Sequence, residues 1–278
     1  TEPLSCAPHF CSAADMTSVP RKSIGETGLN VSMRGLGTVK FGRNEEGKYP
    51  TSFAIPDDQP VLALLSQAHG AGVNLLDTAP AYGSAQQRLG QLVGSSEDWI
   101  ICSKVGERFS NGVSEYIYSE TETRQTVEES LRALKREALD IVLIHSNGED
   151  LNVLQQTPVM ETLLQLKAEG KIRATGISSK TVEGGLLALE YMDIVMCTYN
   201  LQETAELPVI QAAAQQDKGI FIKKGLMSGH LDKSAHNNPL LASYEHIFAQ
   251  SGVTSLIVGT INPAHLTQNI DALLQVIR

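Results

Sequence analysis

Short apolar runs alternate with amphipathic stretches from residue 34 to the end of the chain. Most of the apolar runs are almost continuous in Val, Ile and Leu, which is typical of strands buried on both faces of a parallel sheet. The pattern predicts eight strands, at residues 34–41, 74–79, 99–106, 139–146, 172–179, 193–200, 219–226 and 255–260.

The stretches between these runs have the spacing of amphipathic helices. In the clearest one, residues 120–137, Val127, Leu131 and Leu134 repeat at helical spacing, and Ser119 with Glu122 has the pattern of a capping box. The full set of predicted helices is 60–70, 86–94, 120–137, 160–170, 183–191, 206–216, 239–250 and 263–277. Eight strands alternating with eight helices favour an α/β fold, a (β/α)8 TIM barrel.

A doubly wound open sheet is the alternative fold. The first strand–helix junction lacks the G-x-G-x-x-G pattern that cradles a pyrophosphate in such folds, which favours the barrel. Residues 21–32 predict a short β-hairpin that caps the barrel floor. Residues 1–20 are expected to be a disordered N-terminal extension or a cloning remnant, so that the barrel domain spans residues 21–278.

Composition narrows the functional classes. The 278 residues are 42% hydrophobic and 19% charged, with a net charge of -9 and no cluster of Lys and Arg. We therefore expect neither nucleic acid nor a membrane as a partner. Cys102 and Cys197 lie in predicted strands, whereas Cys6 and Cys11 lie in the N-terminal extension. None has the spacing of a zinc site, so we expect no metal and a cytoplasmic, reducing location.

Polar residues follow three neighbouring predicted strands where catalytic groups gather in barrels, at the strand C-termini. Asp77 and Tyr82 follow the second strand, Lys104 lies in the third and His145 ends the fourth. Each alone has a structural explanation: a helix cap, a packed ring, a solvated lysine and a core histidine. Together they form a proton donor. A lysine ammonium lowers the pKa of a nearby tyrosine, an aspartate holds the lysine, and a neutral histidine orients a substrate oxygen.

The segments "LLDTAPAYG", "CSKVG" and "LIHS", in this order, resemble the aldo-keto reductases, which are NAD(P)H-dependent carbonyl reductases. The resemblance runs from about residue 22 to about residue 275. It implies that Tyr82 is the general acid/base, that Lys104 tunes it and that Asp77 holds Lys104. His145 is implied to orient the substrate carbonyl.

The resemblance also implies a nicotinamide cofactor, expected to be NADPH with NADH as the alternative. The implied cofactor-binding residues are Gly37, Thr38, Asp77, Ser178, Ser179, Lys223, Lys224, Leu226, Ser228, Gly229, Gly259, Thr260, His265, Gln268 and Asn269. Relatives that bind the 2′-phosphate of NADPH often carry Lys and Arg at the positions of Gly259 and His265 in this chain. The absence of these charges weakens the NADPH assignment.

Other positions also depart from the family pattern. Met196 replaces a Gln that holds the nicotinamide amide, and Ser179 replaces an Asn. Lys223 lies near the place of an aromatic residue that stacks on the nicotinamide. Side chains alternate along a strand, so the simpler expectation is that only one of the adjacent Lys223 and Lys224 faces the barrel mouth and the other points to the helices. The alternative is that the lysine at the mouth contacts a cofactor phosphate or an acidic substrate group.

The sequence thus favours an enzyme that transfers a hydride between a nicotinamide cofactor and a small aldehyde or ketone, or the reverse oxidation of an alcohol or sugar. The chain is expected to be a monomer. One alternative is a non-catalytic, redox-sensing NAD(P)-binding barrel; another is a Schiff-base aldolase using Lys104 or Lys223. The loops 42–60 and 107–119 supply candidate pocket-wall residues, Tyr49, Phe53, Phe109, Tyr116 and Tyr118, which otherwise serve as loop anchors.

Overall fold

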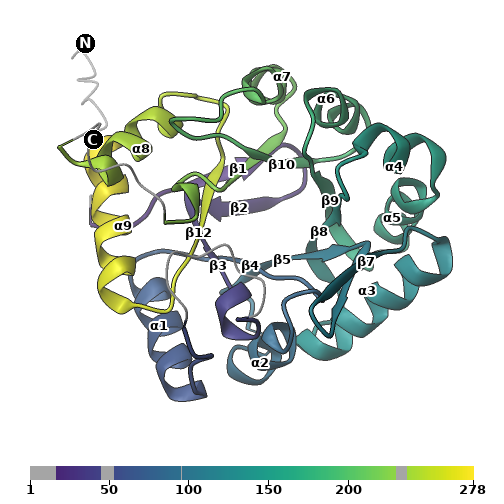
Figure 1. The fold of residues 1–278 in the computed structure, drawn as a ribbon, viewed down its shortest axis with the longest axis horizontal. Helices are drawn as coiled ribbons and strands as arrows, with labels where there is room; N and C mark the ends of the chain where they lie inside the picture. The colour runs from purple at the N-terminus through teal and green to yellow at the C-terminus, as the bar shows by residue number, and fades with distance from the viewer. Residues whose placement is uncertain (1–16, 45–52, 95, 230–236) are drawn as a thin grey trace, which may run out of the picture.

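Eight parallel strands close into a barrel with helices around its outside (Figure 1). The structure is a computed structural model that describes residues 17–44, 53–94, 96–229 and 237–278. The barrel strands are β3 Arg34–Gly37, β4 Leu75–Asp77, β5 Ile100–Val105, β8 Leu139–His145, β9 Ile172–Ser178, β10 Ile194–Thr198, β11 Gly219–Lys223 and β12 Ser255–Gly259. All eight predicted strands are present and the predicted barrel is confirmed; β12 pairs with β3 to close it.

Two hydrophobic clusters follow from the alternation of side chains along each strand. One cluster lies inside the barrel and includes Leu75, Ile141 and Phe221. The larger cluster lies between the strands and the helices, where Leu36 and Leu76 face outward. Because both faces of each strand are buried, the strand sequences are apolar throughout.

The helices surround the strands in chain order, except that α5 lies next to α3, and α4 lies between α5 and α6 (Figure 1). They are α1 Asp58–Gly70, α2 Ala85–Leu92, α3 Glu120–Leu134, α4 Asp150–Gln156, α5 Val159–Ala168, α6 Val182–Tyr191, α7 Leu207–Gln215, α8 Pro239–Phe248 and α9 Pro263–Val276. The predicted cap of α3 is confirmed, because the Ser119 hydroxyl oxygen accepts a hydrogen bond from the Glu122 N–H at 3.2 Å. The short helix α4 was not predicted.

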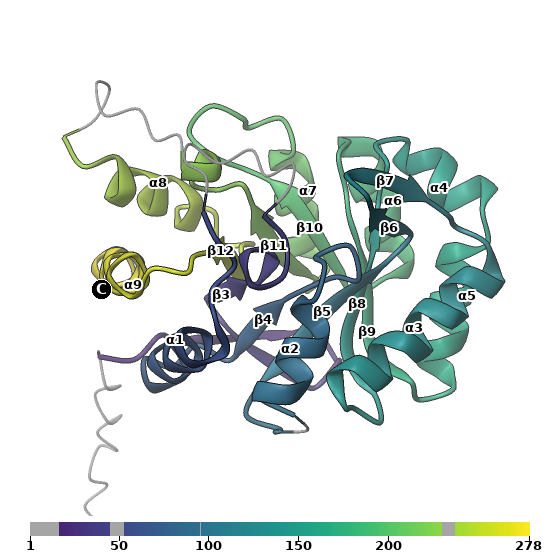
Figure 2. The same cartoon turned by 60° about the horizontal axis from the view of Figure 1, so that its bottom comes forward.

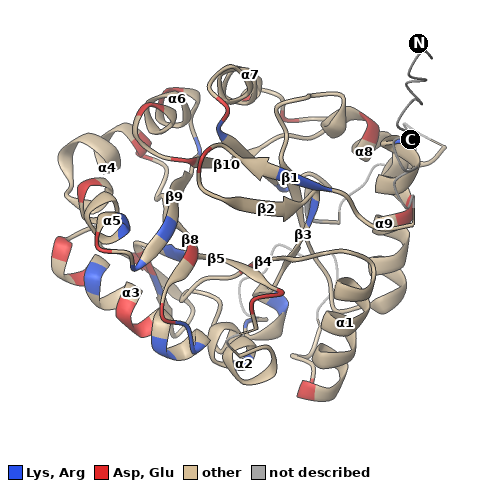
Figure 3. Ribbon diagram, turned by 180° about the vertical axis from the view of Figure 1, so that it is seen from behind, with Lys and Arg blue, Asp and Glu red and all other residues tan. Residues whose placement is uncertain are grey.

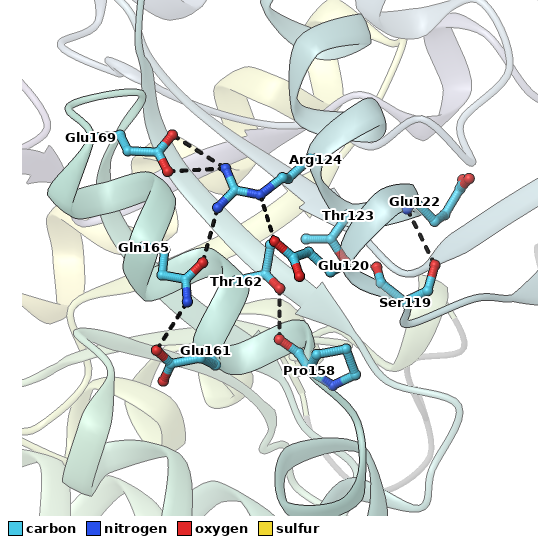
Figure 4. Close-up of polar contacts among 10 residues, drawn as sticks. All are labelled: Ser119, Glu120, Glu122, Thr123, Arg124, Pro158, Glu161, Thr162, Gln165 and Glu169. Atoms are coloured by element: carbon cyan, nitrogen blue, oxygen red, sulfur yellow. Dashed lines mark hydrogen bonds and ion pairs between the residues drawn. The ribbon is translucent and has the colours of Figure 1, made fainter.

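Polar contacts join α3 to α5 on the outer surface (Figure 4). Arg124 donates to both carboxylate oxygens of Glu169, at 3.0 and 3.2 Å, and to the Gln165 side-chain oxygen at 2.9 Å. Acidic and basic residues alternate along the α3 ribbon when the molecule is seen from behind (Figure 3). This alternation is typical of a solvated helix face.

Two hairpins lie at opposite ends of the barrel (Figure 2). The predicted N-terminal hairpin is confirmed as β1 Arg21–Ile24 paired with β2 Leu29–Ser32, and it covers the barrel floor with apolar side chains that join the interior cluster. Residues 107–119, expected to be a loop, contain a second hairpin, β6 Glu107–Ser110 and β7 Val113–Tyr116. It follows the C-terminal end of β5 and therefore lies at the barrel mouth.

Some sequence predictions fall outside the described residues, namely those for the first sixteen residues, including Cys6 and Cys11, and for Tyr49. Within the described residues, Cys102 and Cys197 are buried free thiols, as predicted. None of the helices in the described part of the chain has the length and hydropathy needed to cross a membrane.

Candidate active site

The candidate site is the last layer of inward-facing positions at the C-terminal ends of the barrel strands. Leu75 of β4 faces the interior, and two residues later the same face carries Asp77; Cys102 and Lys104 repeat this on β5. The layer consists of Gly37, Asp77, Lys104, His145, Ser178, Thr198, Lys223 and Gly259. A cavity of about 500 Å³ opens there.

The cavity wall contains the four predicted catalytic residues and part of the predicted cofactor set. Its lining residues are Asp77, Tyr82, Lys104, His145, Ser178, Lys180, Met196, Thr198, Glu203, Ala205, Glu206, Lys223, Lys224 and Ile257. The structure therefore brings together residues from seven strands that are up to 180 positions apart in sequence, Asp77 and Ile257. Such convergence on one concave site is the usual geometry of a barrel active site.

Asp77 and Lys104 form a buried ion pair. The Lys104 Nζ lies 2.6 Å from the Asp77 Oδ1 and also donates to the Thr78 carbonyl at 2.9 Å. The two residues are 5% and 2% exposed. Burial alone would lower the pKa of Lys104, but the Asp77 carboxylate outweighs it and raises that pKa above its usual value. Lys104 is therefore a fixed cation.

Tyr82 lies next to this ion pair in the turn that follows β4. The Lys104 Nζ is 5.0 Å from the centroid of the Tyr82 ring. Burial raises the pKa of Tyr82, and Lys104 only partly opposes this rise. Lys104 acts on the tyrosine pKa in the predicted direction, but burial is the larger effect, so the pKa of Tyr82 lies above its usual value. Tyr82 keeps its proton at neutral pH.

His145 has a carboxylate partner that the sequence analysis missed. The His145 Nδ1 lies 2.7 Å from the Glu107 Oε2, and the other Glu107 oxygen accepts a hydrogen bond from the Ser114 hydroxyl at 2.6 Å. Burial opposes ionisation of Glu107, but the contact with His145 prevails and lowers the pKa of Glu107 to about 2. Burial lowers the pKa of His145, so the imidazole is neutral at pH 7.

Local backbone geometry places Glu107 against His145. Gly106 has a φ of 103°, and a Cβ there would lie 2.5 Å from the Tyr118 ring, so this turn from β5 into β6 requires glycine. The signal in the sequence was the position of Glu107, three residues after Lys104 in the segment that leaves the barrel mouth.

Of the aromatic side chains proposed for the pocket wall, the four among the described residues, Phe53, Phe109, Tyr116 and Tyr118, lie outside the cavity lining. The Tyr118 hydroxyl donates to the His145 carbonyl at 2.9 Å and accepts from the Asn147 N–H at 2.9 Å, which makes Tyr118 an anchor of the histidine backbone. The Arg43 guanidinium stacks 3.3 Å from the Phe109 ring centroid. The loop-anchor alternative therefore describes these two residues. Tyr116 packs beside Tyr118, and the Lys40 Nζ lies 5.2 Å from the Phe53 ring.

Lys223 and Lys224 both line the cavity but differ in environment. Lys223 shares the inward face of Phe221, and its Nζ donates to the Ser178 hydroxyl at 2.9 Å and to the Ser179 carbonyl at 2.6 Å. Burial lowers the pKa of Lys223 to about 8. Lys224 follows the end of β11 with a φ of 55° and an exposed side chain. The Ser179 hydroxyl donates to the Glu206 Oε1 at 2.7 Å.

The nicotinamide end of a dinucleotide fits this cavity. Ser178 and Lys223 supply polar atoms in the wall. Gly37 of β3 lies beside Gly259 of β12, and a Cβ on Gly37 would lie only 3.3 Å from the Gly259 backbone. Because neither residue has a side chain, the barrel mouth stays open at this point for a ligand.

Several expected cofactor ligands direct their side chains into the fold instead. The Thr38 hydroxyl donates to the Asp77 carbonyl at 2.9 Å, and the Thr260 hydroxyl oxygen accepts from the Asn262 N–H at 3.0 Å. The Asn269 amide accepts from the Tyr244 hydroxyl at 2.8 Å and donates to the His265 carbonyl at 2.7 Å. None of these three residues lines the cavity.

The remaining expected ligands lie after β11, at the end of β12 and in the first half of α9. Gly259, His265 and Gln268 are exposed, whereas Leu226 packs against the hydrophobic core. Ser228 and Gly229 belong to the short 3-10 helix η2 Met227–Gly229. In the part of the chain that the structure describes, no three His, Cys, Asp or Glu side chains gather so that they could hold a metal ion.

Comparisons with known proteins agree with this geometry. The profile of the "Aldo/keto reductase family" matches residues 35–246. A crystal structure from Pseudomonas aeruginosa, assigned to the aldo-keto reductases, is 47% identical, with a TM-score of 0.84 over 93% of this chain and 95% of that chain.

Two curated enzymes are more distant relatives. The NADH-specific methylglyoxal reductase of Escherichia coli is 26% identical over 310 residues, which cover 90% of this chain and 92% of the relative. The L-galactose dehydrogenase of Arabidopsis thaliana is 26% identical over 231 residues, which cover 78% and 68%.

Proposed function

The chain belongs to the aldo-keto reductase family of oxidoreductases, and from this premise we propose that it reduces the carbonyl group of small aldehydes or ketones with Tyr82 as general acid. The observation that carries the proposal is the Asp77–Lys104 ion pair beside Tyr82 in a cavity at the barrel mouth. The same site oxidises an alcohol or sugar when the reaction runs in reverse.

In the proposed mechanism Tyr82 donates the proton. Its raised pKa keeps the phenol protonated until negative charge develops on the carbonyl oxygen. The Lys104 ammonium then stabilises the forming phenolate, and Asp77 keeps Lys104 charged and in place. When bound, the nicotinamide cofactor supplies the hydride for the carbonyl carbon.

His145 orients the substrate in this proposal. Because Glu107 lies on the Nδ1 side, the Nε2 side is left for the substrate oxygen. A neutral imidazole at this point adds no charge that would compete with the proton donor.

The cofactor proposal remains NADPH, with NADH as the alternative. The resemblance to the family supports NADPH. At the two positions where a 2′-phosphate is often gripped, however, the chain has Gly259 and an exposed His265, neither of which carries a permanent positive charge. The E. coli relative is named as NADH-specific. The ratio of kcat/KM for NADPH and NADH with one aldehyde decides between them.

The substrates we propose are small and polar. One relative is named for methylglyoxal and another for L-galactose, so 2-oxoaldehydes and aldoses are the first compounds to test. The cavity of about 500 Å³ holds a molecule of that size beside a nicotinamide ring. The chain is proposed to act as a monomer, and the buried free thiols Cys102 and Cys197 support a cytoplasmic location.

The decisive experiment compares the native protein with Tyr82→Phe. We expect oxidation of the reduced cofactor with the aldehyde panel to slow by 10²–10⁴-fold in the variant, because a positioned general acid contributes that much. Cofactor affinity should stay within a few fold, since the ring remains. Cofactor binding with no turnover of any carbonyl by the native protein would instead support the redox-sensing barrel, which the altered Met196 and Lys223 positions favour.

A further inference from the structure

Lys223 places a positive charge in the cavity wall that no carboxylate of the described residues neutralises through an ion pair. Its two hydrogen-bond acceptors, the Ser178 hydroxyl and the Ser179 carbonyl, are both neutral. Lys104, in contrast, lies 2.6 Å from the Asp77 carboxylate. An ammonium has three N–H bonds, so one N–H of Lys223 remains for the cavity.

The acidic group that faces Lys223 from α7 is engaged elsewhere. Glu206 accepts from the Ser179 hydroxyl at 2.7 Å and from the Thr198 N–H at 2.8 Å. The Glu206 carboxylate attracts the Lys223 ammonium without contacting it, so it reduces the positive potential of Lys223 in the cavity but does not cancel it. The other titratable groups around Lys223 are Lys180 at the end of β9, Cys197 on β10, Glu203 before α7, Lys224 after β11, and Asp77, Tyr82, Lys104 and His145 across the cavity.

If the proposed function holds, the nicotinamide ring must bind in the region of positive potential around Lys223. Hydride transfer requires the reacting atoms to approach to about 3–3.5 Å, and Tyr82 must reach the oxygen of the same carbonyl group. The nicotinamide ring therefore lies inside the cavity that Tyr82 and Lys223 both line. The reduced ring is neutral, whereas the oxidised ring carries one positive charge.

We propose that Lys223 makes this protein bind the reduced nicotinamide cofactor more tightly than the oxidised form, and that it thereby favours carbonyl reduction and release of the spent cofactor. The inference rests on the proposed function, because it needs the nicotinamide in this cavity. The Lys223 ammonium repels the positively charged oxidised ring but not the neutral reduced ring. We expect a preference of about tenfold, which is about 30 mV for a two-electron couple.

The preference should depend on pH. Burial lowers the pKa of Lys223 to about 8, so its charge is present at pH 6.5 and absent at pH 9.5. Tyr82 and Cys197 have raised pKa values and keep their protons in this window. The pKa of His145 is lowered, so the imidazole stays neutral over most of the window. When Lys223 loses its proton, the preference for the reduced cofactor should therefore be lost.

The test measures equilibrium dissociation constants of the reduced and oxidised cofactor, by ligand fluorescence and calorimetry, without substrate. We expect the ratio of the oxidised to the reduced Kd to fall about tenfold in Lys223→Met at pH 6.5. Lys135→Met, which removes the same charge from an exposed side chain outside the cavity lining, should leave the ratio unchanged. The native protein at pH 9.5 should approach the ratio of Lys223→Met, which tests the idea without a substitution.

An unchanged ratio in Lys223→Met, or a native ratio that does not vary between pH 6.5 and 9.5, would overturn the inference. Either result leaves the proposed function intact if Tyr82 still supports turnover. Failure of the proposed function has a different signature, which is binding of neither cofactor form or no turnover of any carbonyl compound.

Discussion

His145 depends on Glu107 for its orientation, because the carboxylate holds the imidazole Nδ1 at 2.7 Å. We predict that Glu107→Gln lowers kcat/KM about tenfold, the effect of losing one hydrogen bond to a charged group. The negative charge of Glu107 raises the pKa of His145 against the effect of burial, so its removal lowers that pKa further. The acid limb of the pH profile of kcat/KM should therefore move to lower pH.

Glu115→Gln is the matched control for this prediction. Glu115 lies on the neighbouring strand β7 of the same hairpin with an exposed side chain, so its substitution removes an equal charge without touching His145. If Glu107→Gln and Glu115→Gln have the same pH profile as the native protein, Glu107 has no positioning role. A purely structural role would lower stability without moving the acid limb.

Arg34 is a second residue with an unusual environment. It is fully buried at the start of β3 beside the Tyr244 hydroxyl, and no carboxylate among the described residues pairs with its guanidinium group. Burying an uncompensated charge is costly. We predict that Arg34→Met raises the free energy of unfolding by about 2 kcal/mol, measured by urea denaturation.

Arg136 supplies the control of opposite sign. It is also largely buried, but it donates to the Ser96 and Trp99 carbonyls at 2.8 and 3.1 Å. Arg136→Met should therefore lower the free energy of unfolding, because it leaves two carbonyls without a donor. Equal destabilisation by both substitutions would show that the interaction of Arg34 with Tyr244 outweighs the cost of burying its charge.

At the scale of elements, hydrophobic periodicity was sufficient to predict the barrel. Strands buried on both faces leave continuous apolar runs, and helices on the outside leave a 3.6-residue period, so both signals are local. The structure shortens most of the predicted strands, for example from residues 219–226 to Gly219–Lys223. Phe221 faces the interior of the barrel, and alternate residues of a strand share one face. Lys223, two residues after Phe221, could therefore have been identified from the sequence as the lysine directed into the barrel.

The elements at the mouth were harder to predict because their stability comes from contacts distant in sequence. The β6–β7 hairpin contains the polar segment "ERFSNGVSEY", whose strands are half-exposed and lack an apolar run. Its residue Glu107 is held by His145, which is 38 positions away. Likewise, nothing local indicates that Asn269 pairs with Tyr244 rather than with a ligand.

The cap of α3 gives a prediction at this scale. Because the Ser119 hydroxyl oxygen accepts from the Glu122 N–H, Ser119→Ala should lower the free energy of unfolding by about 1 kcal/mol. Thr121→Ala is a suitable control, since Thr121 is exposed in the first turn and alanine has the higher helix propensity. The two free energies of unfolding, measured by urea denaturation, should move in opposite directions. A Ser119→Ala protein as stable as the native one would show that the cap contributes nothing.

At the scale of the whole molecule, the barrel tolerates an unpaired cation in its mouth because strands on all sides fix the wall. The lowering of the Lys223 pKa from 10.5 to about 8 corresponds to the free-energy cost of burying this cation. At 1.36 kcal/mol for each pKa unit, the charged lysine lowers the free energy of unfolding by about 3 kcal/mol at pH 7. Between pH 8 and 10.5 the unfolded chain binds a proton at this side chain that the folded protein has released. The contribution of Lys223 to stability therefore rises with pH in this range.

Lys223→Met should consequently be more stable than the native protein at pH 7, by up to about 3 kcal/mol, with a difference that shrinks as pH rises from 8 towards 10.5. Urea denaturation at pH 7, 8.5 and 10 measures this difference directly. Comparison of two variants at each pH removes the common effect of the buried tyrosines and thiols, whose raised pKa values act in the opposite direction. Lys180→Met, at an exposed position, should show no such pH-dependent gain. A constant difference across pH would mean that Lys223 is not a buried cation in the folded protein, and a variant less stable at pH 7 would mean that its two hydrogen bonds outweigh the cost of burial.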